Sequence, residues 1–227
     1  MQIIPKCNFF NYLAKKSEEY LSDAEEITVL DVGCGDKPYE KHIKEILKKK
    51  SKVINYIGID YYSEKSDLKI DLNTELIPLK NNSVDLIICT EVLEHLYNPF
   101  LPLSEFQRII KPNGVQLITI PLLSPVHHEN HDYFRFTHHY FRRYFKDDNI
   151  LEEICSNTFL SYFLYVFEYY LGRFFDFLGI NIGKVSTKIV GTLQMPFDWL
   201  TFKLIGKEKL LSFSCYTGIG YLVKKKK

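Results

Sequence analysis

Short apolar runs alternate with amphipathic stretches along the first 121 residues of the chain. The runs are rich in valine, isoleucine and leucine, which is typical of strands that are buried on both faces of a sheet. The stretches between them carry apolar residues three or four positions apart, which predicts helices. The predicted strands are residues 27–32, 53–60, 68–73, 83–90 and 115–121.

Strands and helices that alternate at this spacing predict a parallel sheet with crossover helices. The predicted fold class is therefore α/β, a Rossmann-like doubly wound sheet. Ligands of such sheets bind outside the carboxyl ends of the strands. Polar residues collect at those ends, and we expect the functional site there. They are Asp31, Gly33, Gly35, Asp60, Asp71, Thr90 and Glu91.

The pattern changes after the fifth predicted strand and the segment that follows it. Residues 150–157 (ILEEICSN) predict a sixth strand, and the apolar part of residues 214–227 (SCYTGIGYLVKKKK) predicts a last one. The aromatic-rich residues 157–211 lie between them, and we interpret them as a helical insertion. Residues 1–26 form a helical N-terminal segment, and residues 27–227 form one domain.

The insertion has the periodicity of a helix with one apolar face. Charged residues interrupt it at Glu168, Arg173 and Asp176, so we do not expect a membrane-spanning helix. We favour a lid over the pocket or a homodimer contact. The alternative is peripheral membrane contact through residues 159–205, supported by the lysines at 224–227. The apolar face comprises Phe159, Phe163, Val166, Tyr170, Phe174 and Phe177.

Composition and charge bear on the cellular location of the protein and on its class of partner. The formal net charge is +1, so the overall electrostatics do not indicate a nucleic-acid partner. The five cysteines are scattered without a CxxC pair, which is typical of reduced intracellular thiols. The N-terminal residues lack the apolar run of a signal peptide. We therefore expect a cytoplasmic location, with membrane association as an open alternative.

The stretch VLDVGCGDKP, residues 29–38, predicts a strand that ends in a tight turn able to admit a ligand. In a dinucleotide site a third glycine would stand at position 38, which is proline here. Asp31 and Asp36 disfavour a pyrophosphate beside the turn and favour a cationic ligand with a ribose, such as S-adenosyl-L-methionine. A nicotinamide-dependent oxidoreductase and a turn without a ligand are the alternatives.

Two further acids extend the predicted nucleoside site. Asp60 ends a strand, where a carboxylate can accept hydrogen bonds from the ribose hydroxyls. Asp71 could accept the adenine amino group beside the backbone of Leu72, and an Asx turn explains Asp71 equally well.

The segments VLDVGCG, YIGID, IDLNTELIPLKNNSVDLIICTEVLEHL and IIKPNGVQLITIP occur in this order between residues 27 and 121. In order and spacing they resemble the successive motifs of class I S-adenosylmethionine-dependent methyltransferases, especially the small-molecule members. The resemblance implies a seven-stranded sheet whose last strand is antiparallel. The chain departs from the family at Lys37 and Pro38, where many members have a further glycine, and we expect a stiffer turn there.

The resemblance also implies roles for the residues at the sheet edge. Asp31, Gly33 and Gly35 would cradle the amino-acid part of the cofactor. Asp60 would hold the ribose and Asp71 the adenine, and Thr90 and Glu91 would line the pocket floor. In the same segment, Glu94 and His95 are interpreted as structural residues near the cofactor.

The segment PLLSPVHHENHDYFRFTHHYFRRYF, residues 121–145, is rich in histidine. Methyl transfer to a hydroxyl requires a base, and we select His128, with Asp132 to orient its ring. Arg135 could hold an acceptor carboxylate or phosphate. Alternatives are a metal site at His127 and His131, which we do not favour because the HExxH order is absent, and a surface loop without a chemical role.

The residues HENHDYFRFT resemble a loop of a methyltransferase subgroup associated with polysaccharide and surface-glycan biosynthesis, with His127 or His128, Asp132, Arg135 and Thr137 at the matching positions. The sequence therefore predicts a methyltransferase that uses S-adenosyl-L-methionine and acts on an oxygen of a small-molecule, glycan or lipid-linked acceptor. A catalytically inactive nucleoside-binding module is a further alternative.

Overall fold

The computed structural model describes residues 2–4, 6–127, 130–156 and 218–226, together with part of one helical segment. In that segment the described residues are Phe163, Val166, Phe167, Tyr170, Leu171, Phe174, Phe177 and Leu178. The histidine selected as the base, His128, lies outside the described residues.

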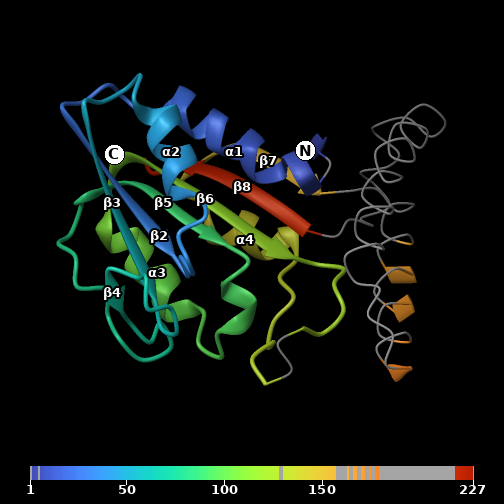
Figure 1. Ribbon diagram of the computed structural model, residues 1–227. Coiled ribbons are helices and arrows are strands. Elements are labelled where there is room, and N and C mark those ends of the chain that lie inside the picture. Colours follow the sequence, from blue (N-terminus) through green and yellow to red (C-terminus); the bar gives the residue numbers. More distant parts are fainter. Residues whose placement is uncertain are drawn as a thin grey trace.

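Within the described part of the chain, eight strands form one sheet in the order β1-β7-β8-β6-β5-β2-β3-β4 (Figure 1). Neighbouring strands are parallel except at β8, which is antiparallel to both β6 and β7. The bounds are β1 Gln2–Ile4, β2 Glu26–Val32, β3 Val53–Asp60, β4 Leu68–Lys69, β5 Val84–Thr90, β6 Ile110–Pro121, β7 Asn149–Ser156 and β8 Gly218–Lys224. The predicted seven strands and the antiparallel last strand are confirmed.

Helices cover both faces of the sheet, as the doubly wound prediction requires. In Figure 1, α1 and α2 lie above the sheet, and α3 and α4 lie on its other side. The helices are α1 Lys6–Tyr20, α2 Glu40–Leu47, α3 Phe100–Ile109 and α4 His138–Tyr144, with a 3₁₀ helix at Leu93–His95.

The two faces of the sheet have separate hydrophobic cores because side chains alternate along each strand. In β2, Ile27 and Val29 pack with α1 and α2, whereas Leu30 and Val32 pack with α3 and α4. Burying each such side chain contributes roughly 1.5–3 kcal/mol. This packing fixes the register of the central strands and therefore the position of their carboxyl ends.

Three details differ from the sequence prediction. The short strand β1 was not predicted, and it pairs with β7 in parallel at the sheet edge. The predicted strand 68–73 is limited to Leu68–Lys69, because the following residues form a turn. Strand β6 begins at Ile110 rather than at the predicted residue 115.

The described residues of the insertion are helical from Phe163 to Phe177, in agreement with the predicted periodicity. No helix among the described residues is both long enough and apolar enough to cross a membrane. Several aromatic side chains on this segment are exposed, and Phe177 is 86% exposed. Phe159 and residues 179–217 lie outside the described part of the chain.

Candidate functional site

The glycine turn follows β2, and its two glycines meet different requirements. Gly33 has a φ of 65°, and a Cβ there would lie 2.4 Å from Cγ2 of Val92. Gly35 has a φ of 50°, and nothing lies within 4 Å of the position of its Cβ. Gly33 is therefore required for packing, whereas Gly35 leaves open space beside the backbone, which is the space a ligand would need.

Lys37 stands where many family members have a further glycine, and it adopts the left-handed conformation, with a φ of 56°. For a residue with a Cβ this conformation costs roughly 1–2 kcal/mol. The backbone N–H of Lys37 donates to the carbonyl of Cys34 at 2.8 Å, and its Nζ lies 2.6 Å from Oδ1 of Asp67. These contacts hold Lys37 in a conformation that glycine adopts without strain.

Asp60 connects the end of β3 to the glycine turn. Its Oδ2 accepts a hydrogen bond from Gly35 N at 3.0 Å. Its Oδ1 accepts from the backbone N–H groups of Tyr62 and Ser63, at 2.8 and 2.9 Å. A carboxylate has about four lone-pair sites, so Asp60 retains acceptor capacity on Oδ2.

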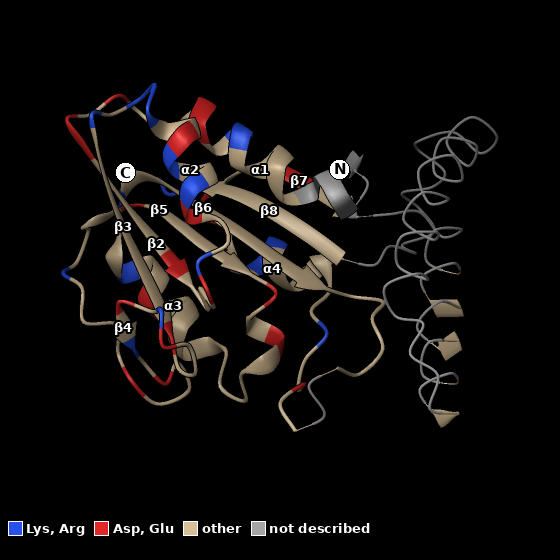
Figure 2. Ribbon diagram, viewed as in Figure 1, with Lys and Arg blue, Asp and Glu red and all other residues tan. Residues whose placement is uncertain are grey.

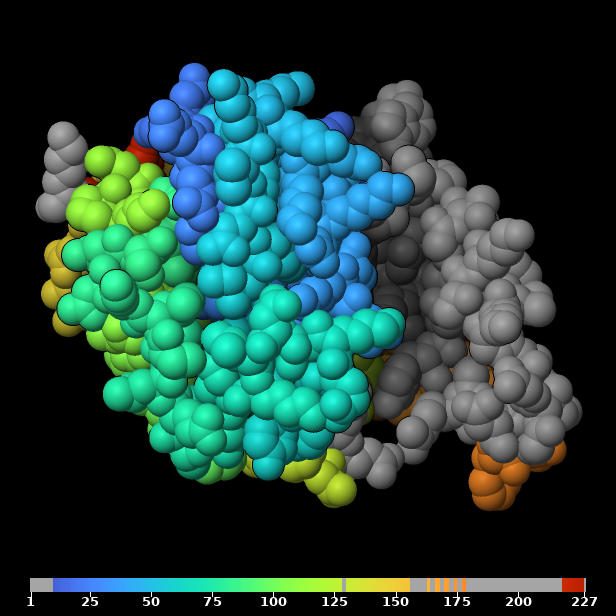
Figure 3. Space-filling view, turned by 60° about the vertical axis from the view of Figure 1, so that its left-hand side comes forward, coloured from blue at the N-terminus to red at the C-terminus, as the bar shows by residue number. Residues whose placement is uncertain are grey.

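A pocket of about 930 Å³ lies at the carboxyl ends of the strands. Figure 3 shows one face of the molecule formed by blue to teal residues, with yellow-green residues of the segment after β6 at its lower edge. The predicted residues Gly33, Gly35, Asp60, Asp71, Leu72 and Glu91 line this pocket.

The charge of the pocket wall is mainly negative. Acidic residues recur in the segments around β3 and β4, as the red positions of Figure 2 show. A concave site with this charge attracts cations and repels phosphates. The charged lining residues are Asp36, Asp60, Glu64, Asp71 and Glu91, with Lys65, whose Nζ lies 2.9 Å from Asp36.

Two predicted cofactor residues lie outside the described pocket wall. Asp31 is 1% exposed and accepts a hydrogen bond from the Tyr56 hydroxyl at 2.6 Å. Burial raises the pKa of Asp31 to about 6. Thr90 is half-buried at the end of β5. Asp31 lies in β2 two residues before Gly33, and its described side-chain hydrogen bond is to Tyr56 of β3.

Asp71 forms the Asx turn that the sequence raised as one interpretation, and it also lines the pocket. Its Oδ1 accepts hydrogen bonds from the backbone N–H and the side-chain amide of Asn73, at 2.9 and 3.0 Å, which is an Asx turn. The backbone N–H of Asn73 holds the pKa of Asp71 below its usual range. The residue also lines the pocket next to Leu72, so it remains ionised beside any ligand there.

Residues missed by sequence reasoning also line the pocket. Tyr61 and Tyr62 follow Asp60 directly and are 56% and 72% exposed. Tyr133 and His131 reach the pocket from the segment after β6. The signal for the first pair was available in the sequence, because two aromatic residues directly after an acid at the end of a strand offer surfaces for stacking.

Asp132 and Arg135 form an ion pair within the segment that follows β6. Arg135 Nη2 donates to Asp132 Oδ2 at 2.7 Å, and Nη1 contacts Oδ1. Arg135 also donates to the carbonyls of Ser124, Pro125 and Phe134. The hydrogen bonds from Arg135 hold the pKa of Asp132 down, at about 2. The described hydrogen bonds of the Arg135 guanidinium are therefore made to other residues of this same loop.

The loop packs on the 3₁₀ helix through backbone contacts. Tyr133 N donates to the carbonyl of Glu94 at 2.7 Å, and His95 Nδ1 lies 2.6 Å from the carbonyl oxygen of His131. His95 also lines the pocket at the carboxyl ends of the strands. His127 N donates to Asp132 Oδ2 at 2.9 Å and its ring Nδ1 lies 3.4 Å from the same oxygen, so the described histidine beside Asp132 is His127.

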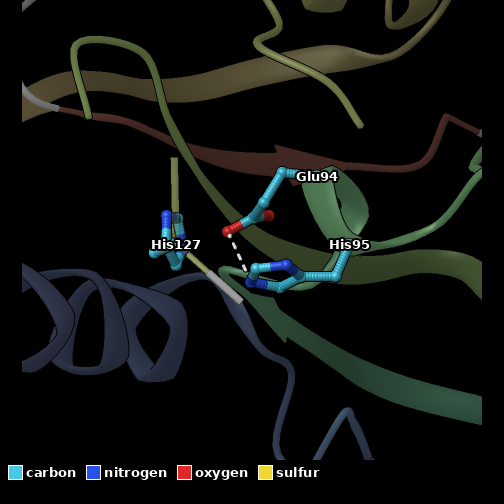
Figure 4. Close-up of side chains that lie close together, drawn as sticks. All are labelled: Glu94, His95 and His127. Atoms are coloured by element: carbon cyan, nitrogen blue, oxygen red, sulfur yellow. Dashed lines mark ion pairs between the residues drawn. The ribbon is translucent and has the colours of Figure 1, made fainter. Parts of the chain in front are cut away.

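A cluster of possible metal ligands lies where the loop meets the 3₁₀ helix. Glu94, His95 and His127 each offer one ligand atom, and these atoms lie within 4.8 Å of one another. Figure 4 shows the Glu94 carboxylate directed toward the two imidazole rings.

A family model described as a methyltransferase domain matches residues 8–155. The chain belongs to this methyltransferase family. Its fold is that of class I S-adenosylmethionine-dependent methyltransferases, as predicted from the sequence motifs.

A curated protein is similar to the chain in sequence, and two solved structures are similar to it in fold. The chain is 31% identical over 114 residues to the ubiquinone biosynthesis O-methyltransferase of Rickettsia typhi, covering 48% of this chain and 46% of that protein. It therefore spans about half the length of this relative. Among solved structures, a phosphoethanolamine N-methyltransferase 2 from Haemonchus contortus matches at 13% identity with a TM-score of 0.55, covering 96% of this chain and 53% of that one. The [4+2]-cyclase SpnF matches at 14% identity with a TM-score of 0.56, covering 95% and 80%.

Proposed function

We propose that this methyltransferase uses S-adenosyl-L-methionine to methylate an oxygen of a small-molecule acceptor, which includes glycan and lipid-linked compounds. The observation that carries the proposal is the acid-lined pocket at the glycine turn. Its negative wall suits a sulfonium and an ammonium group, and it does not suit the pyrophosphate of a nicotinamide dinucleotide.

The residues present fit the cofactor. The open space at Gly35 admits the ligand close to the backbone. The remaining acceptor capacity of Asp60 suits a ribose hydroxyl. Asp71 and Leu72 form the wall assigned to adenine, and Glu91 the pocket floor. When bound, the cofactor supplies a methyl group on a sulfonium whose S–C bond breaks as the acceptor C–O bond forms, and the electron pair stays on sulfur.

The acceptor side of the proposal rests on the segment after β6. The hydroxyl proton of the acceptor passes to a base, for which His128 remains our candidate. Asp132 and Arg135 act as positioning residues that hold this segment against the pocket. An oxygen acceptor agrees with the name of the Rickettsia relative. A glycan acceptor is supported by the HENHDYFRFT loop alone.

Calorimetric titration with S-adenosylhomocysteine tests the cofactor assignment. We expect binding to the unaltered protein and at least ~10-fold weaker binding to Asp60→Ala, the scale of about 1.4 kcal/mol for one lost interaction. Binding of NADH in place of S-adenosylhomocysteine would show that the pocket belongs to an oxidoreductase.

A labelled-methyl assay on a panel of catechols, glycans and lipid-linked sugars then identifies the acceptor class. Transfer to a hydroxyl that is lost in His128→Ala, with S-adenosylhomocysteine binding retained, supports the base assignment. A protein that binds S-adenosylhomocysteine and transfers no methyl group to the panel would instead favour the inactive binding module.

A further inference from the structure

Glu94 is a buried acid whose environment does not satisfy it. The residue is 0% exposed, and neither of its carboxylate oxygens has a hydrogen-bond partner among the described residues. A buried charge without a partner costs several kcal/mol. An ionised Glu94 therefore needs a cation beside it.

The two histidines beside Glu94 are held in the manner of metal ligands. His95 Nδ1 lies 2.6 Å from the carbonyl oxygen of His131, so this nitrogen carries the proton and Nε2 carries the lone pair. That Nε2 lies 3.5 Å from Glu94 Oε1. Metal-binding histidines ordinarily donate their second ring N–H to such a carbonyl or carboxylate. His95 therefore has the tautomer that a metal ligand requires.

His127 completes the cluster from the other side. Its Nδ1 lies 3.2 Å from the carbonyl of Pro125 and 3.4 Å from Asp132 Oδ2. As in His95, contacts at Nδ1 therefore hold the ring in place. The rings of His95 and His127 meet edge to face with centroids 4.9 Å apart. Both rings and the carboxylate thus converge on one point (Figure 4).

We propose that Glu94, His95 and His127 bind a divalent transition-metal cation. Two imidazoles and one carboxylate suit Zn²⁺, Mn²⁺ or Co²⁺ better than Ca²⁺, which prefers oxygen ligands alone. The cation would neutralise the buried carboxylate and use both lone pairs of the histidines.

The cluster also borders the cofactor pocket, because His95 lines that pocket. Three protein ligands leave coordination positions for water or for an acceptor oxygen, and a coordinated hydroxyl loses its proton more readily. This catalytic role rests on the proposed function, whereas metal binding itself does not. The sequence raised a metal site at His127 and His131 as an alternative. In the proposed site, His127 is instead combined with Glu94 and His95.

The experiment is a calorimetric titration of the full, untagged chain, stripped with a chelator, with Zn²⁺ and separately with Mn²⁺. We expect one ion per chain, bound at least ~10-fold more weakly by Glu94→Gln and by His127→Ala, since even outer-shell changes cost 10–100-fold. With Co²⁺ the unaltered chain should give a visible absorption band that both variants lack.

The matched control is His139→Ala, which removes an exposed imidazole on α4 and should leave the ion affinity unchanged. Circular dichroism of each variant checks folding, and His127→Ala keeps the test valid if Glu94→Gln does not fold. Absence of ion binding to the unaltered chain, or equal affinity in His127→Ala, overturns the proposal.

Titration of the same stripped samples with S-adenosylhomocysteine separates the two proposals. Cofactor-product binding without ion binding contradicts the metal site and leaves the proposed function intact. Ion binding without S-adenosylhomocysteine binding contradicts the proposed function and leaves the metal site intact.

Discussion

Gly33 and Gly35 differ in their surroundings, so substitution of each glycine by alanine should have a different effect on stability. Gly33→Ala places a Cβ against Val92 in a left-handed conformation, and we expect a loss of roughly 2–4 kcal/mol in the free energy of unfolding. Gly35→Ala meets no neighbour and should cost only about 1–2 kcal/mol. Urea denaturation of both variants measures the difference.

Val92 provides the check on this explanation. In the Gly33→Ala background, Val92→Ala removes the clashing methyl groups and should recover about 1 kcal/mol or more in a double-mutant cycle. A coupling energy near zero would show that strain at Gly33, rather than contact with Val92, determines the cost.

Asp31 should make stability dependent on pH. Its pKa is about 6 in the folded chain and 3.8 ordinarily, so the folded state holds the proton more tightly. The resulting stabilisation is fully present below pH 3.8 and is lost as the pH rises through 6. It amounts to about 3 kcal/mol at 1.36 kcal/mol per pH unit. Denaturation between pH 4 and pH 7 should show this decline relative to Asp31→Asn, which cannot titrate.

Asp36 supplies the comparison for Asp31, because it belongs to the same turn and its side chain is 73% exposed. Asp36→Asn should retain the pH dependence of the unaltered chain. If Asp31→Asn retains it as well, another group is responsible.

At the scale of elements, the ion pair of Asp132 and Arg135 should determine whether the loop after β6 stays in place. Arg135→Ala leaves the Asp132 carboxylate, whose side chain is 1% exposed, without its cation. We expect a loss of about 2–4 kcal/mol in the free energy of unfolding, near the range for a broken buried pair. Thermal and urea unfolding measure the loss.

Arg143→Ala is the control for the ion pair, since it removes an exposed arginine from α4 and should change stability by less than about 0.5 kcal/mol. Unchanged stability in Arg135→Ala would contradict the positioning role. That result would instead favour the role expected from the sequence, in which Arg135 binds a carboxylate or phosphate of the acceptor.

Most elements could be predicted because their own residues determine them. The buried strands β2 and β5 are largely apolar runs, whereas β3 is partly buried, and the observed bounds of all three differ from the predicted ones by no more than one residue at an end. Strand β1 is different, because its three residues carry too little pattern and form a strand by pairing with β7. The extent of β4 was also missed, because the Asx turn at Asp71 competes with strand pairing there.

At the scale of the whole molecule, the sequence predicted the edge of the sheet at which the pocket lies but not the cluster of Glu94, His95 and His127. The glycine turn, Asp60 and Asp71 each follow a predicted strand, and parallel strands bring their carboxyl ends together. The meeting of His127 with Glu94 depends on how the loop packs on the 3₁₀ helix, through the contacts to the carbonyls of Glu94 and His131. No periodicity in the sequence encodes that packing.

The pocket joins distant parts of the chain, so its ligand should stabilise the whole domain. Its wall includes Gly33, Asp60, Glu91 and Tyr133, which come from four separate segments. At a concentration of S-adenosylhomocysteine about 100 times its Kd, binding adds about 2.7 kcal/mol. For a chain of this size that corresponds to a rise in Tm of roughly 5–10 °C. Asp60→Ala, measured against its own Tm without ligand, should show a clearly smaller rise at the same concentration, because it loses the acceptor that we propose for the ribose. A rise of equal size with NADH, or none with S-adenosylhomocysteine, would mean that the acid-lined pocket does not select the sulfonium cofactor.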